Sequence, residues 1–239
     1  MRIAITVPVM YVISIMAFGA PLGEVLSLNA VMRLKNVRVI QCDVWGNLSF
    51  EYAVLDLEKL LKVVSVLSNE PSLNIYQEKD DFGCSEGEKV FKWLTESWFS
   101  YVYAATLTLL PCQIIENQFS MWKPTMIEVG RVQENAEFLE NRLISGDLRL
   151  FYLQEPFEFP SAVLVRIIQN VLEAPEDYRR YGLDIRVFFD YSAKALMNEM
   201  TESGRCRHQR YMYIFDNQAP ILKVENLSGH RWRLQYLHH

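Results

Sequence analysis

The residues LDIRVFFD at 183–190, followed by SAKALMNEMTESG at 192–204, decide the fold of this chain. Every second residue of the first stretch is apolar: Leu183, Ile185, Val187 and Phe189. This period of two predicts a β-strand with one buried face. Ser192 is a residue type that begins helices and Gly204 one that ends them, so a helix follows the strand. A strand leading into a helix is typical of a sheet covered by helices.

Helices and strands also alternate upstream of this stretch. One predicted helix ends at Gly146 and carries its apolar side chains on one face: Val132, Ala136, Leu139 and Leu143. A strand is predicted from the alternating residues Leu148, Leu150 and Tyr152. After Pro160, Ser161 can cap a second helix, whose apolar side is formed by Leu164, Ile167, Ile168, Val171 and Leu172.

Three β segments are predicted near the end of the chain: Tyr211 to Phe215, Pro220 to Glu225 and His230 to Tyr236. We therefore expect a fold between α/β and α+β, with a mixed β-sheet covered by helices and a C-terminal antiparallel three-strand meander.

The first half gives a similar but less regular pattern. Strands are predicted at Val37 to Val44, Leu48 to Leu55, Leu73 to Gln77 and Tyr101 to Leu110, and helices at Asp56 to Leu67 and about Glu86 to Trp98. Pro111 and Pro124 bracket a stretch that we interpret as irregular. We place a boundary there, which gives an N-terminal α/β half at 1–125 and a C-terminal α/β half at 126–239; one continuous domain is the alternative.

The uncharged run from Ile3 to Gly23 supports two interpretations. It is long enough to span a membrane or to serve as a signal peptide. Pro8 and the many β-branched residues favour instead a buried central strand over Ile3 to Val9, then an apolar connection and a helix over about Leu22 to Leu34. The second interpretation predicts a cytoplasmic protein, and the first an exported or membrane-anchored one.

Composition limits the classes of function. A net charge of −5 argues against general nucleic-acid binding, which depends on neutralising phosphates. The charge is unevenly distributed: residues 203–239 carry six basic side chains and two acidic ones, which is +4 and leaves −9 for the rest. All four histidines lie in the same segment. Chemistry that needs an imidazole must therefore involve this part of the chain.

Common catalytic and metal motifs are missing. The chain has no dinucleotide-binding glycine motif, no phosphate-binding loop, no zinc-protease motif and no nucleophile elbow. The four cysteines are widely spaced, and we interpret them as buried thiols rather than metal ligands. Cys206 and His208 with His230 match no common zinc site. We expect no metal and no cofactor.

Asp190 is one candidate for a ligand-binding residue. It ends a predicted strand just before a helix, and open α/β sheets bind ligands beyond the carboxyl ends of their strands. An aspartate there also suits a strand-ending turn or a helix cap.

The segment from His208 to Asn226 resembles the phospholipase D superfamily, whose motif is H-x-K-x(4)-D followed by G-S-x-N. Here His208-Gln209-Arg210 stands for H-x-K, Asp216 for the aspartate and residues 223–226 for G-S-x-N. The segment departs from the motif, because the spacing from His208 to Asp216 is one residue too long, Arg replaces Lys and Gly-Ser is absent. The second copy of the motif that the family needs is missing. The resemblance implies at most an inactive relative of that fold.

The last predicted strand places Arg231 and Arg233 on the face opposite its apolar residues. If Lys223 joins them from the neighbouring strand, a basic strip forms that suits an acidic protein surface or a phosphate-bearing ligand. A charged edge that prevents aggregation is the alternative.

These observations support two functions. The first is a non-enzymatic binding protein or complex subunit of the inhibitor, immunity or adaptor type, using the basic C-terminal surface. The second is an enzyme acting on phosphate esters or nucleotides through Asp190, His208 and Arg210. The enzyme needs these three residues in one pocket, whereas the binding protein does not.

Overall fold

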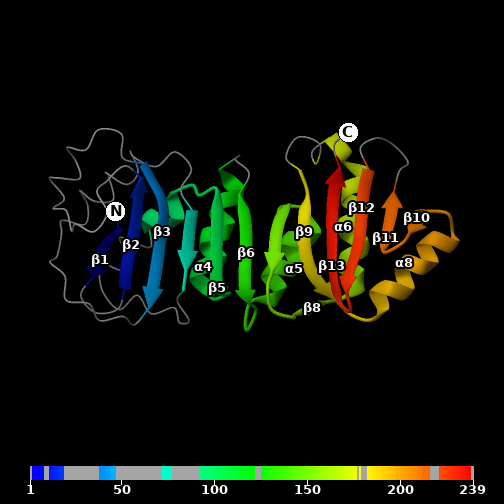
Figure 1. The fold of residues 1–239 in the computed structure, drawn as a ribbon, viewed down its shortest axis with the longest axis horizontal. Coiled ribbons are helices and arrows are strands. Elements are labelled where there is room, and N and C mark those ends of the chain that lie inside the picture. Colours follow the sequence, from blue (N-terminus) through cyan, green and yellow to red (C-terminus); the bar gives the residue numbers. More distant parts are fainter. Residues whose placement is uncertain are drawn as a thin grey trace. The chain divides into compact units, whose positions relative to one another are not determined.

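A computed structural model describes residues 2–7, 11–18 and 38–46 as strand backbone, and residues 72–76, 92–121, 125–176, 178, 182–215 and 221–237 with side chains for nearly all of them. The chain divides into two compact units, Met1–Thr125 and Met126–His239. Each is a β-sheet with helices, as expected from the sequence (Figure 1). The division into domains stays a prediction.

The described strands of the first unit follow the order β1-β2-β3-β4-β5. Their bounds are Arg2–Val7 for β1, Tyr11–Phe18 for β2, Arg38–Gly46 for β3, Ser72–Ile75 for β4 and Tyr101–Thr106 for β5. The first three strands are antiparallel to one another, and β4 and β5 run parallel to β3. The unit is thus a mixed sheet.

The N-terminal apolar run is a hairpin of two strands. A strand at the beginning was predicted, but its central position was wrong, because β1 ends the strand order and pairs with β2 alone among the described strands. The apolar connection expected after Val9 is largely strand β2. Pro8 itself lies outside the described residues. No helix in the described part of the chain is long and apolar enough to cross a membrane.

Helix α4 (Leu109–Ser120) replaces the irregular stretch expected after Pro111 and also the end of the strand expected to reach Leu110. Pro111 lies in the first helical turn, where an N–H has no partner within the helix, so proline is tolerated. The first turn therefore accommodates the residue that we took as a helix breaker.

Several expectations for the first half lie outside the described residues: the strand at 48–55, the helices at 22–34 and 56–67, and the side chains of Cys42 and Cys84. Cys112 and Cys206 are buried, in agreement with their interpretation as core thiols.

The second unit has one sheet in the order β6-β7-β9-β13-β12-β11-β10, with β8 also pairing with β9. Its strands are β6 (Met126–Arg131), β7 (Leu150–Leu153), β8 (Glu158–Phe159), β9 (Asp184–Phe189), β10 (Arg207–Gln209), β11 (Met212–Phe215), β12 (Ile221–Ser228) and β13 (Arg231–Leu237). The strands β6, β7, β8 and β9 are parallel where they pair, and the strands from β13 to β10 pair antiparallel.

Among the described helices, α5 (Ala136–Ser145), α6 (Ser161–Glu173) and α8 (Ser192–Glu202) cover one face of this sheet. Figure 1 views the sheet from the other side, with α5 and α6 behind the strands. Burial alternates along the strands, so that Val187, Trp232 and Leu234 are fully buried while their neighbours on the strand are partly exposed. The apolar row of β13 packs in the core as predicted. The other face, which we call the open face, is partly exposed.

Strand β10 was not predicted. The predicted three-strand antiparallel meander, β11, β12 and β13, is confirmed, and β10 extends it by a fourth strand. With three residues and no apolar side chain, Arg207-His208-Gln209 lacks the alternation that identifies a strand.

We predict that Gln118→Leu lowers the free energy of unfolding by about 2–3 kcal/mol, because one buried and one partly buried backbone group lose their partner. The buried amide of Gln118 accepts a hydrogen bond from the Phe99 N–H (2.9 Å) and donates one to the Ser97 carbonyl (3.0 Å). Urea denaturation measures the change. Gln113→Leu, on the exposed side of α4, is the control, and equal effects of the two changes would contradict the prediction.

Candidate functional site

The open face of the second unit carries a network of charged side chains. Arg186 on β9 and Arg233 on β13 lie directly opposite each other in the antiparallel register. Glu225 on β12 lies opposite Arg233 on its other side. Like charges facing each other across a sheet destabilise it, so these arginines need a compensating group nearby.

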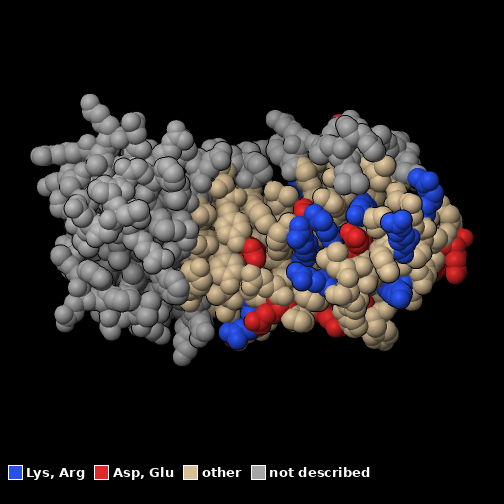
Figure 2. Space-filling view, viewed as in Figure 1, with Lys and Arg blue, Asp and Glu red and all other residues tan. Residues whose placement is uncertain are grey.

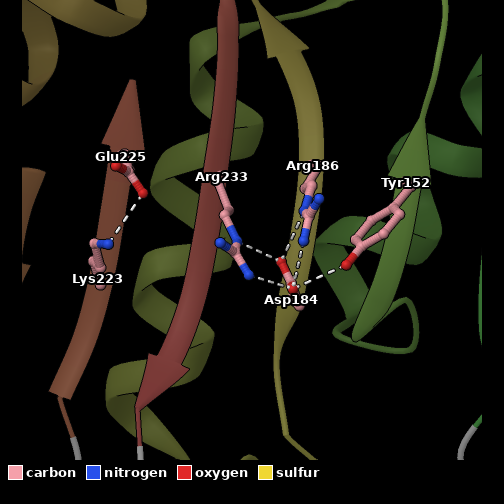
Figure 3. A network of polar contacts seen from close by, with 6 residues as sticks. All are labelled: Tyr152, Asp184, Arg186, Lys223, Glu225 and Arg233. Carbon is pink, nitrogen blue, oxygen red and sulfur yellow. Dashed lines mark hydrogen bonds and ion pairs between the residues drawn. The ribbon is translucent and has the colours of Figure 1, made fainter. Parts of the chain in front are cut away.

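Asp184 is that group (Figure 3). Its carboxylate accepts two hydrogen bonds from Arg233, at 2.9 and 2.7 Å, and weaker ones from Arg186 at 3.4 and 3.3 Å. Tyr152 on β7 donates its hydroxyl to the same carboxylate at 3.0 Å, and the guanidinium of Arg186 stacks 4.1 Å from the centre of the Tyr152 ring. One carboxylate thus connects three neighbouring strands.

The network shifts the pKa values of its members. Burial alone would raise the pKa of Asp184, but the hydrogen bonds from Arg233, Arg186 and Tyr152 outweigh it and hold this pKa below the ordinary value. The hydrogen bond to Asp184 raises the pKa of Arg233. Burial, with the hydrogen bond to Asp184, raises the pKa of Tyr152. Asp184 therefore stays charged, and Tyr152 neutral, at neutral pH.

The expected strip of Lys223, Arg231 and Arg233 lies on this one face, but acidic residues interrupt it. Lys223 pairs with Glu225 at 3.1 Å rather than lying beside the arginines, and it faces Gln235. Figure 2 shows basic and acidic side chains interleaved over the second unit. Three cations of the open face, Arg186, Arg233 and Lys223, are thus engaged by Asp184 and Glu225 within the sheet.

Arg231 differs from the other cations of the open face. Its guanidinium lies 5.8 Å from the centre of the Phe188 ring. Its Nε atom is buried, and no acceptor for it is present in the described part of the chain. A buried donor without a partner costs free energy that an added acceptor could recover.

Asp190 has a structural role in this arrangement. It follows β9, and its carboxylate accepts backbone N–H bonds from Ser161 (3.1 Å) and Ser192 (3.0 Å), as well as the Ser192 hydroxyl. Asp190 therefore caps both α6 and α8. The expectation that Ser161 caps α6 was wrong, because Ser161 lies inside the helix and its side chain makes no cap bond. The hydrogen bond from the Ser192 hydroxyl, together with those from the backbone, lowers the pKa of Asp190.

His208 and Arg210 lie on the β10–β11 hairpin. The His208 ring stacks on Tyr213, with 4.6 Å between ring centroids, and Tyr213 stacks in turn near the buried Trp232 at 6.1 Å. Arg210 is in the turn, where its φ of 58° places it in the left-handed region, and its side chain is exposed.

The candidates for catalysis do not converge. Strands β13, β12 and β11 separate β9, which Asp190 follows, from β10, which carries His208, so these two strands lie about 19 Å apart at about 4.8 Å per strand. Among the phospholipase D-like positions, His208 stacks on Tyr213, Lys223 pairs with Glu225, and the Asn226 amide donates to the Gly229 carbonyl. Asp216 lies outside the described residues. His208, Lys223 and Asn226 thus each have a contact of their own.

Sequence reasoning missed Asp184, Arg186 and Tyr152. The first two occupy the outward positions of a strand that was predicted correctly, so their shared face could be read from the alternation. Their partnership with Arg233 could not, because it depends on β13 lying next to β9.

No known protein family, curated protein or solved structure matches this chain.

We predict that Asp184→Asn lowers the free energy of unfolding at neutral pH by about 2 kcal/mol, since an amide cannot neutralise two arginines that face each other. The pKa of Asp184 in the folded protein lies below 3.8, the ordinary aspartate value. The contribution of this carboxylate to the free energy of unfolding is therefore complete above about pH 3.8, and it disappears as the pH falls through the lowered pKa of the folded state. Urea denaturation at neutral and acidic pH should show the two proteins converging in acid.

The control for this prediction is Asp147→Asn, which breaks a more exposed pair with Arg142 of similar length (2.9 Å). We expect a loss below about 1 kcal/mol. A difference between wild type and Asp184→Asn that stays constant down to acidic pH would contradict the assigned role of the carboxylate.

We also predict that Asp190→Ala lowers the free energy of unfolding by about 1–3 kcal/mol, because the first turns of α6 and α8 lose a shared acceptor. Ser161→Ala removes a hydroxyl that makes no cap bond and should cost clearly less. Thermal unfolding followed by circular dichroism compares the two. A larger loss of stability in Ser161→Ala than in Asp190→Ala would contradict this prediction, because it would identify Ser161 as the cap of α6.

Proposed function

We propose that this protein is a non-enzymatic binding protein or complex subunit, of the inhibitor, immunity or adaptor type, that docks an acidic partner protein on its C-terminal strands. The observation that carries the proposal is the set of exposed cations on and beside the β10–β11 hairpin. Arg205 and Arg210 are exposed, and neither has an ion-pair partner within the described part of the chain.

The sequence around the hairpin strengthens the proposal. Residues 203–215 contain three arginines and one histidine but no acidic residue. This local charge stands out on a chain whose remainder is strongly acidic, and a concentrated charge of one sign favours a partner surface of the opposite sign. Charges at the rim of an interface act mainly on association rate and selectivity, which suits a protein that recognises a partner.

The divided placement of the polar candidates favours binding over catalysis. An enzyme needs its acid, base or nucleophile within hydrogen-bond reach of one reacting group. Asp190 is engaged in capping two helices, and His208 lies on a distant strand. This separation favours the binding protein over the phosphate-ester or nucleotide enzyme.

The contacts on the open face decide which residues can test the proposal. Arg233→Glu would put a second carboxylate against Asp184, so it would disturb the sheet as well as any binding. The charge test therefore uses Arg205 and Arg210, whose side chains are exposed.

We predict that fluorescein-labelled oligoglutamate binds the full chain, with an affinity that falls as salt is added. The double change Arg205→Glu with Arg210→Glu should weaken binding about tenfold, since each exposed charge contact is worth about 0.2–1 kcal/mol and reversal adds repulsion. Fluorescence anisotropy measures both effects. The matched control, Arg166→Glu with Lys194→Glu, makes the same change in net charge at exposed positions on α6 and α8 and should bind like the wild type.

Two results would contradict the proposal. One is equal binding by the two double variants, which would mean that net charge alone governs the interaction. The other is tight binding of tripolyphosphate without binding of oligoglutamate, which would assign the surface to a phosphate-bearing ligand.

A further inference from the structure

We propose that the partner binds as an added β-strand: an extended acidic segment pairs with the free edge of β10 and continues the meander. This inference rests on the proposed function and specifies how the acidic partner is held. Proteins of many kinds bind extended peptides in this way, with main-chain hydrogen bonds supplying affinity and side chains supplying selectivity.

The position of β10 makes the edge available. β10 ends the strand order of the second unit, and among the described strands it pairs only with β11. A strand with an antiparallel neighbour on one side directs alternate N–H and C=O groups away from it. All three residues of β10 are exposed.

The charges along the edge select an acidic strand. Arg205, Arg207, His208 and Arg210 follow one another closely without an intervening acid. Side chains of an added strand would alternate between the two faces of the sheet. A segment that alternates acidic and β-branched residues could place carboxylates near the arginines and still favour an extended backbone.

The hairpin is held in place before any partner arrives. His208 stacks on Tyr213, whose hydroxyl donates to the Asn198 side chain of α8 at 3.0 Å. Cys206, just before β10, is buried with its sulfur 3.5 Å from the Thr201 hydroxyl. An edge already fixed by such contacts loses little conformational entropy on binding.

Arg210 supplies an independent argument. Its φ of 58° lies in a region where glycine or asparagine is favoured and a long side chain is uncommon. Asparagine would form the turn with less strain. Strain that persists at one residue points to a role for that side chain. At the tip of the hairpin, Arg210 would contact the end of an added strand.

The experiment compares two labelled peptides on the full chain. The first alternates glutamate and valine. The second has the same sequence but is N-methylated at successive central peptide bonds, so that neither edge can donate to a sheet. We expect the methylated peptide to bind about tenfold or more weakly in fluorescence anisotropy, as lost main-chain hydrogen bonds are worth about 0.5–1.5 kcal/mol each.

The variant Arg210→Asn separates binding from folding. It should raise the urea midpoint, because the turn is relaxed, and at the same time weaken binding of the unmethylated peptide. Lys194→Asn on α8 removes a charge elsewhere in the same unit and should leave binding unchanged.

The outcomes separate this inference from the proposed function. If both peptides bound equally well, and the double change Arg205→Glu with Arg210→Glu weakened the binding of both, strand addition would be overturned. The proposal that the protein binds an acidic partner would still stand. Binding of neither peptide, nor of oligoglutamate, would overturn both and assign the charged edge to protection against aggregation.

Discussion

The carboxylate of Asp184 allows two arginines to face each other across the central strands of the second unit. Without it, Arg186 and Arg233 would repel each other on neighbouring strands, which is unfavourable wherever a sheet is only partly exposed. With it, the two cations, Tyr152 and three strands are held by one partly buried anion. The geometry of the open face, and hence its charge, depends on this one side chain.

That arrangement determines where a partner can bind. Because Asp184 binds Arg186 and Arg233, and Glu225 pairs with Lys223, these three cations are engaged within the sheet. Arg205 and Arg210, beside and on the β10–β11 hairpin at the end of the strand order, have no ion-pair partner in the described part of the chain. The sheet thus combines a centre of internally paired cations with a basic edge, and the edge is where an acidic segment would gain most.

Much of the second unit could be predicted from the sequence, since periodicity is a local property. The alternation in β9, β12 and β13 and the apolar stripe of α6 follow directly from residue order. Helix α4 was missed because proline in a first turn looks like a helix breaker. Strand β10 was missed because it has no apolar side, and the partners of Asp184 because they depend on which strands are neighbours. Which strands pair with each other in the sheet could not be predicted from the order of residues along the chain.

The central claim is that Arg186 and Arg233 of the open face are engaged internally while Arg205 and Arg210, beside and on the hairpin, are available to a partner. The most direct measurement is a ¹H–¹⁵N spectrum of the arginine Nε–Hε groups of the full chain, titrated with oligoglutamate. The account predicts that the signals of Arg205 and Arg210 move while those of Arg186 and Arg233 stay in place. Movement of the Arg186 and Arg233 signals, with the hairpin arginines unchanged, would contradict it.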